Sequence, residues 1–336
     1  MSWFIIIILL IFFIFLLIVF FSLPKSLPFD PSGKHCLITG GSRGIGKAIG
    51  AELLSRGCRA LSVFARDPIA LATARKELEA LCRQPGQTVH TFQVDLAADG
   101  PAKIEEIVRE AERQSGAVDL LVNNAGTCVQ GAFDELPSDA FERQLRTNFL
   151  GAVYVTRSVV GGMKRRRFGH ISFVCSAAGQ LAIWGYSAYS PSKFALRGFA
   201  DALHMELLPW NVGVSILFPP NTATDGFRDE LRTMPPQIRA ISGTAGLFQA
   251  SDVAARLVQA IEKGHFATTV GMEGWLLGTL SAGASPEPNG IQAFLQVLLG
   301  GLLRGVLLIY GGHFNRLVRN CHHEAVETAA DPQHSS

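Results

Sequence analysis

The sequence predicts an α/β protein with a doubly wound parallel sheet in a single domain between residues 33 and 270. Short apolar or β-branched runs alternate there with stretches of helical periodicity, which is the pattern of parallel βαβ units. A glycine-rich turn joins the first such run to the first helical stretch. A strongly apolar segment stands at each end of the chain, outside this alternation.

Each expected element follows from its local pattern, taken in chain order. Strands are expected where four to six apolar or β-branched residues stand between turn residues, and helices where apolar side chains recur every three or four positions. The expected strands are residues 35–39, 60–65, 89–94, 120–122, 170–175, 213–218 and 267–270. The expected helices are residues 45–55, 70–81, 102–114, 140–163, 192–207 and 252–261.

The N-terminal segment is expected to be a membrane anchor over residues 1–24. Residues 3–21 are an unbroken apolar run of 19 residues, and a helix of that length is about 28 Å long, close to the hydrocarbon thickness of a bilayer. No Lys or Arg precedes the run and no small-residue cleavage motif follows it, which favours an anchor over a cleaved signal peptide. Lys25 and Lys34 follow the run, so the positive-inside rule places the domain in the cytosol.

A second apolar region is expected to contact the membrane over residues 271–320, ahead of a polar tail of residues 321–336. Between residues 291 and 312 large apolar side chains recur at helical spacing, but Arg304 and five glycines argue against a clean span. The pattern favours a helix in the membrane interface or a shallow hairpin with residues 275–280. The alternative is a helix packed on the domain's own core.

Composition excludes two classes of partner. The formal net charge is only +2, too small for the electrostatic footprint of a nucleic-acid-binding protein, so no nucleic-acid partner is expected. The six cysteines are scattered without the paired spacing of a metal site, so no metal is expected. Several stand inside apolar runs, which suits reduced thiols in the cytosol.

The turn TGGSRGIG at residues 39–46 is expected to bind the phosphates of a dinucleotide in a Rossmann-like manner. Its glycines permit a tight turn and a close approach of the backbone, and the N-terminus of the following helix attracts negative charge. The alternative is an ordinary glycine turn. The residues of this turn expected to hold the cofactor are Gly40, Ser42, Arg43, Gly44, Ile45 and Gly46.

The residues after the second and third strands predict which cofactor binds. A carboxylate after the second strand would repel the 2′-phosphate of NADPH, but this chain has Arg66 there and Arg43 in the glycine turn. Two guanidiniums suit a phosphate and favour NADPH. Asp67 is a contrary signal unless it begins the next helix. Asp95 is expected either to accept a hydrogen bond from the adenine amino group or to cap the following helix.

Tyr189, Lys193 and Ser176 form the expected catalytic group. Tyr189 and Lys193 are four residues apart, on one face of a helix. Tyrosine holds its proton tightly near neutral pH, and a lysine one turn away is expected to lower the pKa of the phenol toward useful proton transfer. Ser176 ends an expected strand, where its hydroxyl can face a bound carbonyl. Each residue alone is more often structural, but the combination predicts carbonyl chemistry.

These motifs together resemble the short-chain dehydrogenase/reductase superfamily. The resemblance implies that Tyr189 donates the proton in reduction, that Lys193 tunes it and binds the nicotinamide ribose, and that Ser176 orients the carbonyl. Relatives often pair through the helices that correspond to residues 140–163 and 192–207, and the sequence itself leaves the oligomeric state open. Asn148 would complete a proton relay through a water, and Asn123 to Gly126 would support the adenosine side of the cofactor, with Asn123 among the binding residues.

A closer likeness is carried by residues 121–154, residues 176–207 and the two apolar ends. These resemble the branch of the superfamily that reduces 3-ketosphinganine to sphinganine with NADPH, which implies a long-chain lipid ketone as substrate and an endoplasmic reticulum membrane. The alternatives are a membrane-bound steroid or retinoid dehydrogenase and, more remotely, a non-catalytic NADP-binding scaffold. The loop at residues 219–226 departs from the branch's pattern at positions 221, 223 and 225, so the substrate contacts stay open.

Overall fold

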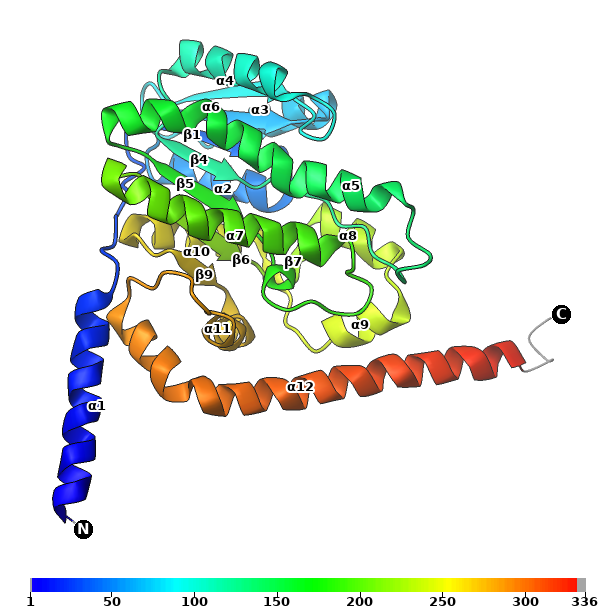
Figure 1. Cartoon of the computed structure of the whole chain (residues 1–336). Coiled ribbons are helices and arrows are strands. Elements are labelled where there is room, and N and C mark those ends of the chain that lie inside the picture. The colour runs from blue at the N-terminus through cyan, green and yellow to red at the C-terminus, as the bar shows by residue number, and fades with distance from the viewer. Residues whose placement is uncertain (1, 331–336) are drawn as a thin grey trace.

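One parallel sheet of seven strands forms the centre of the molecule in the computed structural model, which describes residues 2–330 (Figure 1). The strand order is β3-β2-β1-β4-β5-β6-β9, and it reverses between β1 and β4. Ligands bind at such a reversal in open α/β sheets. The strands are β1 His35–Thr39, β2 Ala60–Ala65, β3 Thr88–Gln93, β4 Leu120–Asn123, β5 His170–Val174, β6 Gly213–Phe218 and β9 Ala267–Thr269. A separate parallel pair consists of β7 Thr222–Ala223 and β8 Phe248–Gln249.

Helices cover both faces of the sheet. One face carries α2 Gly44–Ser55, α3 Pro68–Glu79 and α10 Ala250–Lys263. The other carries α4 Pro101–Ser115, α6 Gly151–Arg166 and α7 Tyr189–Leu207. The helix expected over residues 140–163 is divided, because a π-helical turn at Arg146–Leu150 joins α5 Asp139–Leu145 to α6. The doubly wound fold and every expected strand and helix are therefore confirmed, with ends that shift by a few residues.

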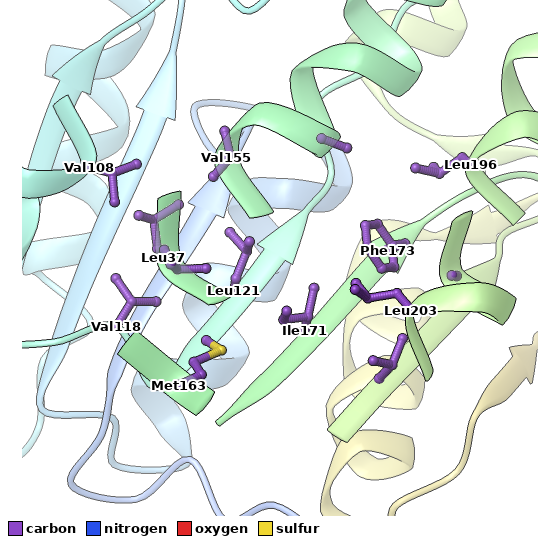
Figure 2. Packing of buried hydrophobic residues seen from close by; sticks show 14 of the residues in the cluster. Leu37, Val108, Val118, Leu121, Val155, Met163, Ile171, Phe173, Leu196 and Leu203 are labelled. Carbon is purple, nitrogen blue, oxygen red and sulfur yellow. The ribbon is translucent and has the colours of Figure 1, made fainter. Parts of the chain in front are cut away.

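The strands read as continuous apolar runs because both faces of the sheet are buried. Successive residues of a strand point to opposite faces. Leu37 of β1 accordingly packs toward α4 and α6, whereas its neighbour Ile38 packs toward α2 and α10. Figure 2 shows the first of these layers, where Leu37, Leu121 and Phe173 meet side chains from the covering helices.

The N-terminal helix α1, Ser2–Ser22, extends away from the domain and buries almost none of its surface (Figure 1). An extended linker follows, and Phe29 fixes it to the domain. Its ring is buried against those of Phe168 and His170, at 5.5 and 5.8 Å between ring centres, and its backbone N–H donates to the carbonyl of Ile261 at 3.2 Å. The apolar segment is thus held at a fixed point of the domain surface.

The C-terminal region forms a helical hairpin of α11 Gly271–Leu280 and α12 Gly290–Ala330. Trp275 donates to the side chain of Gln292 at 3.0 Å, and Gln292 donates to Thr279 at 2.9 Å. The structure supports the expected hairpin over a helix packed on the domain's own core, since only 11% of the apolar part of α12 is buried. The start of α12 lies beside the end of α1, where Phe20 and Leu23 border Gly290.

The boundary expected at residue 321 does not mark the end of a helix. α12 continues without a break to Ala330, because no glycine or proline stands between residues 313 and 330 to end it. The last six residues of the expected polar tail, 331–336, lie outside the described residues. Two described helices, Trp3–Ser22 and Gly290–His322, are long and apolar enough to cross a membrane.

A buried histidine ring and two buried hydroxyl groups form a row of hydrogen bonds between β5 and β6, near the amino end of the sheet. His170 of β5 bonds through Nε2 to the Ser215 hydroxyl at 2.9 Å, and Ser215 donates to Ser172 at 3.0 Å. Burial, with a smaller contribution from nearby His204, lowers the pKa of His170 to about 3. A neutral imidazole is therefore part of the folded state at all physiological pH values.

We expect the fold to lose stability as the pH falls below 6.5. The unfolded chain binds the His170 proton near pH 6.5 and the folded chain only near pH 3, so between these values protons favour unfolding, by about 2 kcal/mol at pH 5. His170→Gln keeps a polar partner for Ser215 but takes up no proton. Denaturant curves at pH 7 and pH 5 give the free energy of unfolding of each protein. Between these pH values it should fall by about 2 kcal/mol less in the variant than in the wild type. Equal losses in the two proteins would contradict this account.

Candidate active site

A cavity of about 930 Å³ opens at the carboxyl ends of the central strands. The reversal of strand order between β1 and β4 places it there, as expected for this class of sheet. Residues of the glycine turn and of the expected catalytic group share its wall. The expected site residues that line it are Gly40, Ser42, Arg43, Gly44, Ile45, Arg66, Asp95, Ser176, Tyr189 and Lys193.

The glycine turn is shaped by contacts that leave no room for side chains. Gly40 has a φ of +65°, a conformation that favours glycine, and a Cβ there would lie 2.8 Å from the Cα of Ala125. A Cβ on Gly46 would collide with the carbonyl of Gly40, so Gly46 acts as a spacer and does not line the cavity. Helix α2 begins here without a side-chain cap. Its free N–H groups suit a phosphate.

Asn124 braces this turn against β4. Its side-chain amide donates to the carbonyls of Thr39 and Gly40, at 3.0 Å each, and its backbone N–H donates to the Thr39 hydroxyl at 3.0 Å. Asn123, which we expected among the cofactor residues, is instead buried and donates to Thr156 of α6 at 3.1 Å. Strand alternation explains the difference, because adjacent side chains point to opposite sides.

Two arginines border the expected adenosine end of the cavity. Arg43 and Arg66 are both exposed, and the described residues include no carboxylate paired with either. Asp67 is explained as the cap of α3, since it accepts from the backbone N–H groups of Ile69 and Ala70 at 2.9 and 3.2 Å. Asp95 lines the cavity, where it can meet the adenine amino group. Its expected alternative role as a helix cap is wrong, because α4 begins at Pro101 after Gly100 and Asp95 accepts only within the preceding turn, from the N–H of Ala97 at 2.9 Å.

Tyr189, Lys193 and Ser176 converge at the other end. Tyr189 is the first residue of α7, and Lys193 lies one turn on, with its ammonium 5.7 Å from the Tyr189 ring centre. Lys193 is buried and donates to the carbonyl of Val174 at the end of β5, at 3.3 Å. Ser176 follows the same strand and hydrogen-bonds with the side chain of Tyr189. The sheet end and one helical turn thus hold three polar groups together.

The expected effect of Lys193 on Tyr189 is wrong for this structure. Desolvation raises the pKa of Tyr189 well above its usual value, the neighbouring Cys128 raises it further, and only the hydrogen bond with Ser176 opposes the rise. Desolvation also lowers the pKa of Lys193. Sequence spacing predicted the contact but not the degree of burial, which dominates here.

Asn148 lies in the π-helical turn, behind the catalytic group. Its amide oxygen accepts from the N–H of Thr127 at 2.8 Å, and its amide nitrogen donates to the carbonyl of Thr127 and to Ser192, both at 2.9 Å. The side chain is buried and does not line the cavity. These bonds fix the start of α7 relative to the loop after β4. A role in a proton relay stays a prediction.

The far wall of the cavity is apolar and comes from the C-terminal hairpin, a contribution that the sequence did not predict. α11 and α12 lie on that side of the domain, and α12 runs past α9, Pro236–Ser242 (Figure 1). The side chains that line this wall are Leu276, Leu277, Leu280, Leu307, Tyr310 and Phe314. Apolar periodicity in residues 291–312 indicated a helix, but only the tertiary fold shows which face borders the cavity.

The loop that departs from the expected pattern is nevertheless ordered by its own contacts. Asn221 donates to the carbonyl and hydroxyl of Ser242 at 3.1 and 2.9 Å. Thr224 caps helix α8, Asp225–Arg232, by accepting from the N–H of Phe227 at 3.0 Å. This helix brings Glu230 to the cavity wall. Glu230 is a further site residue that the sequence did not single out.

Comparisons with known proteins agree with this geometry. The family model described as short chain dehydrogenase matches residues 34–235. A 3-dehydrosphinganine reductase of Danio rerio is 42% identical over 294 residues, which cover 88% of each chain. A 3-ketodihydrosphingosine reductase of Bos taurus is 40% identical over 298 residues, 89% of this chain and 88% of the relative.

The likeness extends to solved structures. A short chain dehydrogenase from Burkholderia cenocepacia, solved in complex with NADP, superposes with a TM-score of 0.62 at 26% identity. The match covers 72% of this chain and 98% of that one. The chain therefore belongs to the short-chain dehydrogenase/reductase family and groups with the relatives named 3-dehydrosphinganine reductase.

Proposed function

We propose that this protein is an NADPH-dependent oxidoreductase that reduces 3-ketosphinganine to sphinganine in sphingolipid biosynthesis. One observation carries the proposal: a single cavity joins the Ser176–Tyr189–Lys193 group to a wall of leucines and aromatic rings from α11 and α12. A polar reducing centre next to an apolar wall suits a ketone with a long alkyl chain. The names of the most similar relatives support the same substrate.

The cofactor end of the cavity fits NADPH. The uncapped start of α2 and the glycines of the turn accommodate the pyrophosphate, and Arg43 and Arg66 offer two unpaired guanidiniums to a 2′-phosphate. Asp95 and the segment from Asn124 to Gly126 line the adenosine side. When bound, the nicotinamide ring supplies the hydride that reduces the carbonyl carbon.

The residues of this chain supply the proton and hold the carbonyl. The Ser176 hydroxyl donates a hydrogen bond to the carbonyl oxygen, and the Tyr189 hydroxyl donates its proton to that oxygen as negative charge develops there. A raised pKa keeps Tyr189 protonated until then. Lys193, held by Val174, places its positive charge beside the phenolate that remains and binds the nicotinamide ribose.

Both apolar helices support a membrane location for this chemistry. α1 and α12 meet beside Gly290, so one region of the surface carries both membrane-compatible helices. We propose that they hold the enzyme on the endoplasmic reticulum, with the domain in the cytosol as the positive-inside rule requires. All six cysteines are free, which suits a reducing compartment. Pairing of two copies through the helices at residues 140–163 and 192–207 stays a prediction from the family resemblance.

Tyr189→Phe should reduce the turnover of 3-ketosphinganine by about 100-fold or more, because it removes only the hydroxyl that donates the proton. Oxidation of NADPH by the purified protein, followed spectroscopically, measures this. Tyr154→Phe on α6 is the matched control, since Tyr154 packs against the core away from the cavity. Faster reduction of retinal or of a ketosteroid than of 3-ketosphinganine would favour the rival substrate classes, and equal rates in wild type and Tyr189→Phe would favour a scaffold.

Arg66→Ala should raise the KM for NADPH by about 10-fold to 100-fold and leave the KM for NADH nearly unchanged. A charged hydrogen bond contributes about 1.5–3 kcal/mol, and only NADPH carries the 2′-phosphate that Arg66 would bind. Arg75→Ala, on the exposed surface of α3 in an ion pair with Glu79, is the control. A parallel rise for both cofactors would contradict the assignment.

Protease added to sealed microsomes should digest the catalytic domain without detergent. The domain follows α1 through a linker with Lys25 and Lys34, which favours the cytosolic side. Immunodetection of fragments with an antibody against the domain measures the outcome, and a lumenal protein serves as the control for sealed vesicles. Protection of the domain until detergent is added would place it in the lumen.

A further inference from the structure

Helix α8 carries three acidic residues, and one of them differs from the other two in its surroundings. Asp225 forms an ion pair with Arg228, and Asp229 pairs with Arg232 at 3.3 Å, both on the exposed side of the helix. Glu230 is half-buried and lines the active-site cavity. Within residues 2–330 no cation lies within ion-pair distance of its carboxylate. The helix therefore presents one unpaired carboxylate to the site.

The position of Glu230 is fixed by its backbone. Gln130, from the loop after β4, donates its side-chain amide to the carbonyl of Glu230 at 2.8 Å. Thr224 caps the same helix at its start. The bond from Gln130 holds α8 to the loop that follows β4, and the cap from Thr224 fixes where the helix begins, so Glu230 has a defined place in the cavity wall.

The carboxylate of Glu230 acts electrostatically on the catalytic group. Its charge raises the pKa values of Tyr189 and Lys193, as well as those of Tyr186 and Cys128, which border the same space. Burial raises the pKa of Glu230 itself to about 7, and Lys193 only partly offsets this. A half-buried carboxylate without a direct cation is costly, and an incoming cation would relieve that cost.

The substrate class of the proposed function offers such a cation. An amino ketone of this class carries a protonated amine on the carbon next to the carbonyl, and an ammonium has three donors for a carboxylate. We propose that Glu230 binds the substrate's ammonium group while Ser176 and Tyr189 hold the neighbouring carbonyl oxygen. This assignment rests on the proposed function and makes Glu230 the residue that selects amino ketones over plain ketones.

A simpler role for Glu230 is that of a counter-charge to Lys193. The two charges interact, but Lys193 donates to the carbonyl of Val174 and forms no ion pair with Glu230 in the described structure. The two roles predict different results. A counter-charge would affect all ketones alike through Lys193, whereas an ammonium site would weaken the binding of substrates with an amine far more than that of substrates without one.

The test compares Glu230→Gln with wild type on two substrates: 3-ketosphinganine and the same ketone with hydrogen in place of the amino group. Glu230→Gln should raise the KM for the amino ketone by about 10-fold to 100-fold, the usual range for loss of one charged hydrogen bond. The KM for the deaminated ketone should change far less, by under about 3-fold, and turnover of that ketone shows that the variant is folded, while a change in kcat through Tyr189 and Lys193 would be shared by both ketones. Asp229→Asn, which removes the exposed neighbouring carboxylate, should leave both substrates unaffected.

Equal changes for both ketones, or no change for either, would overturn the ammonium site. Failure of the wild type to reduce 3-ketosphinganine would overturn the proposed function instead. A binding measurement tests the ammonium site separately from the proposed reaction. Titration calorimetry of sphinganine into the NADP⁺-loaded proteins should show weaker binding to Glu230→Gln by the same factor, and equal affinities would exclude the Glu230 assignment without reference to turnover.

Discussion

The geometry of the site depends on one side chain that joins two strands. The amide of Asn124 binds the two carbonyls at the end of β1, where the chain turns into α2. β1 and β4 diverge at this point because their connecting segments pass to opposite sides of the sheet. This bond adds to those that the Thr39 hydroxyl accepts from the N–H groups of Asn124 and Ala125, and it reaches one residue further, to the carbonyl of Gly40 in the turn. Through these bonds the phosphate-binding turn is connected to the loop after β4, which Asn148 contacts in turn through Thr127.

Burial determines the protonation states at the opposite end of the cavity. Tyr189 and Lys193 are both desolvated, which favours a neutral phenol and weakens the hold of the lysine on its proton. The hydrogen bond from Ser176 opposes this tendency at Tyr189, and the neighbouring Cys175, Cys128 and Glu230 oppose it at Lys193. The site therefore stores a proton on the phenol, and transfer becomes favourable only when a receiving oxygen gains negative charge.

Local pattern predicted the domain well because each element carries its own signal. The strands are apolar on both faces, the turn at residues 39–46 has glycine where φ is positive, and Tyr189 and Lys193 are one helical turn apart. The failures concern relations between distant segments. Asn123 and Asn124 are adjacent in sequence, and only the direction of β4 decides which one reaches the turn. Likewise, nothing local indicates that Leu307 and Glu230 border the same space.

The position of α12 has a consequence for how the enzyme meets its substrate. One face of this helix walls the cavity, whereas Leu302, Leu308 and Ile309 are exposed. With α12 in the bilayer, as proposed above, a lipid would pass into the cavity along the helix without crossing bulk water. For such a route the relevant concentration is the mole fraction of ketone in the surrounding lipid. Dilution of the substrate with inert lipid should slow the enzyme even when the total amount in the sample is constant.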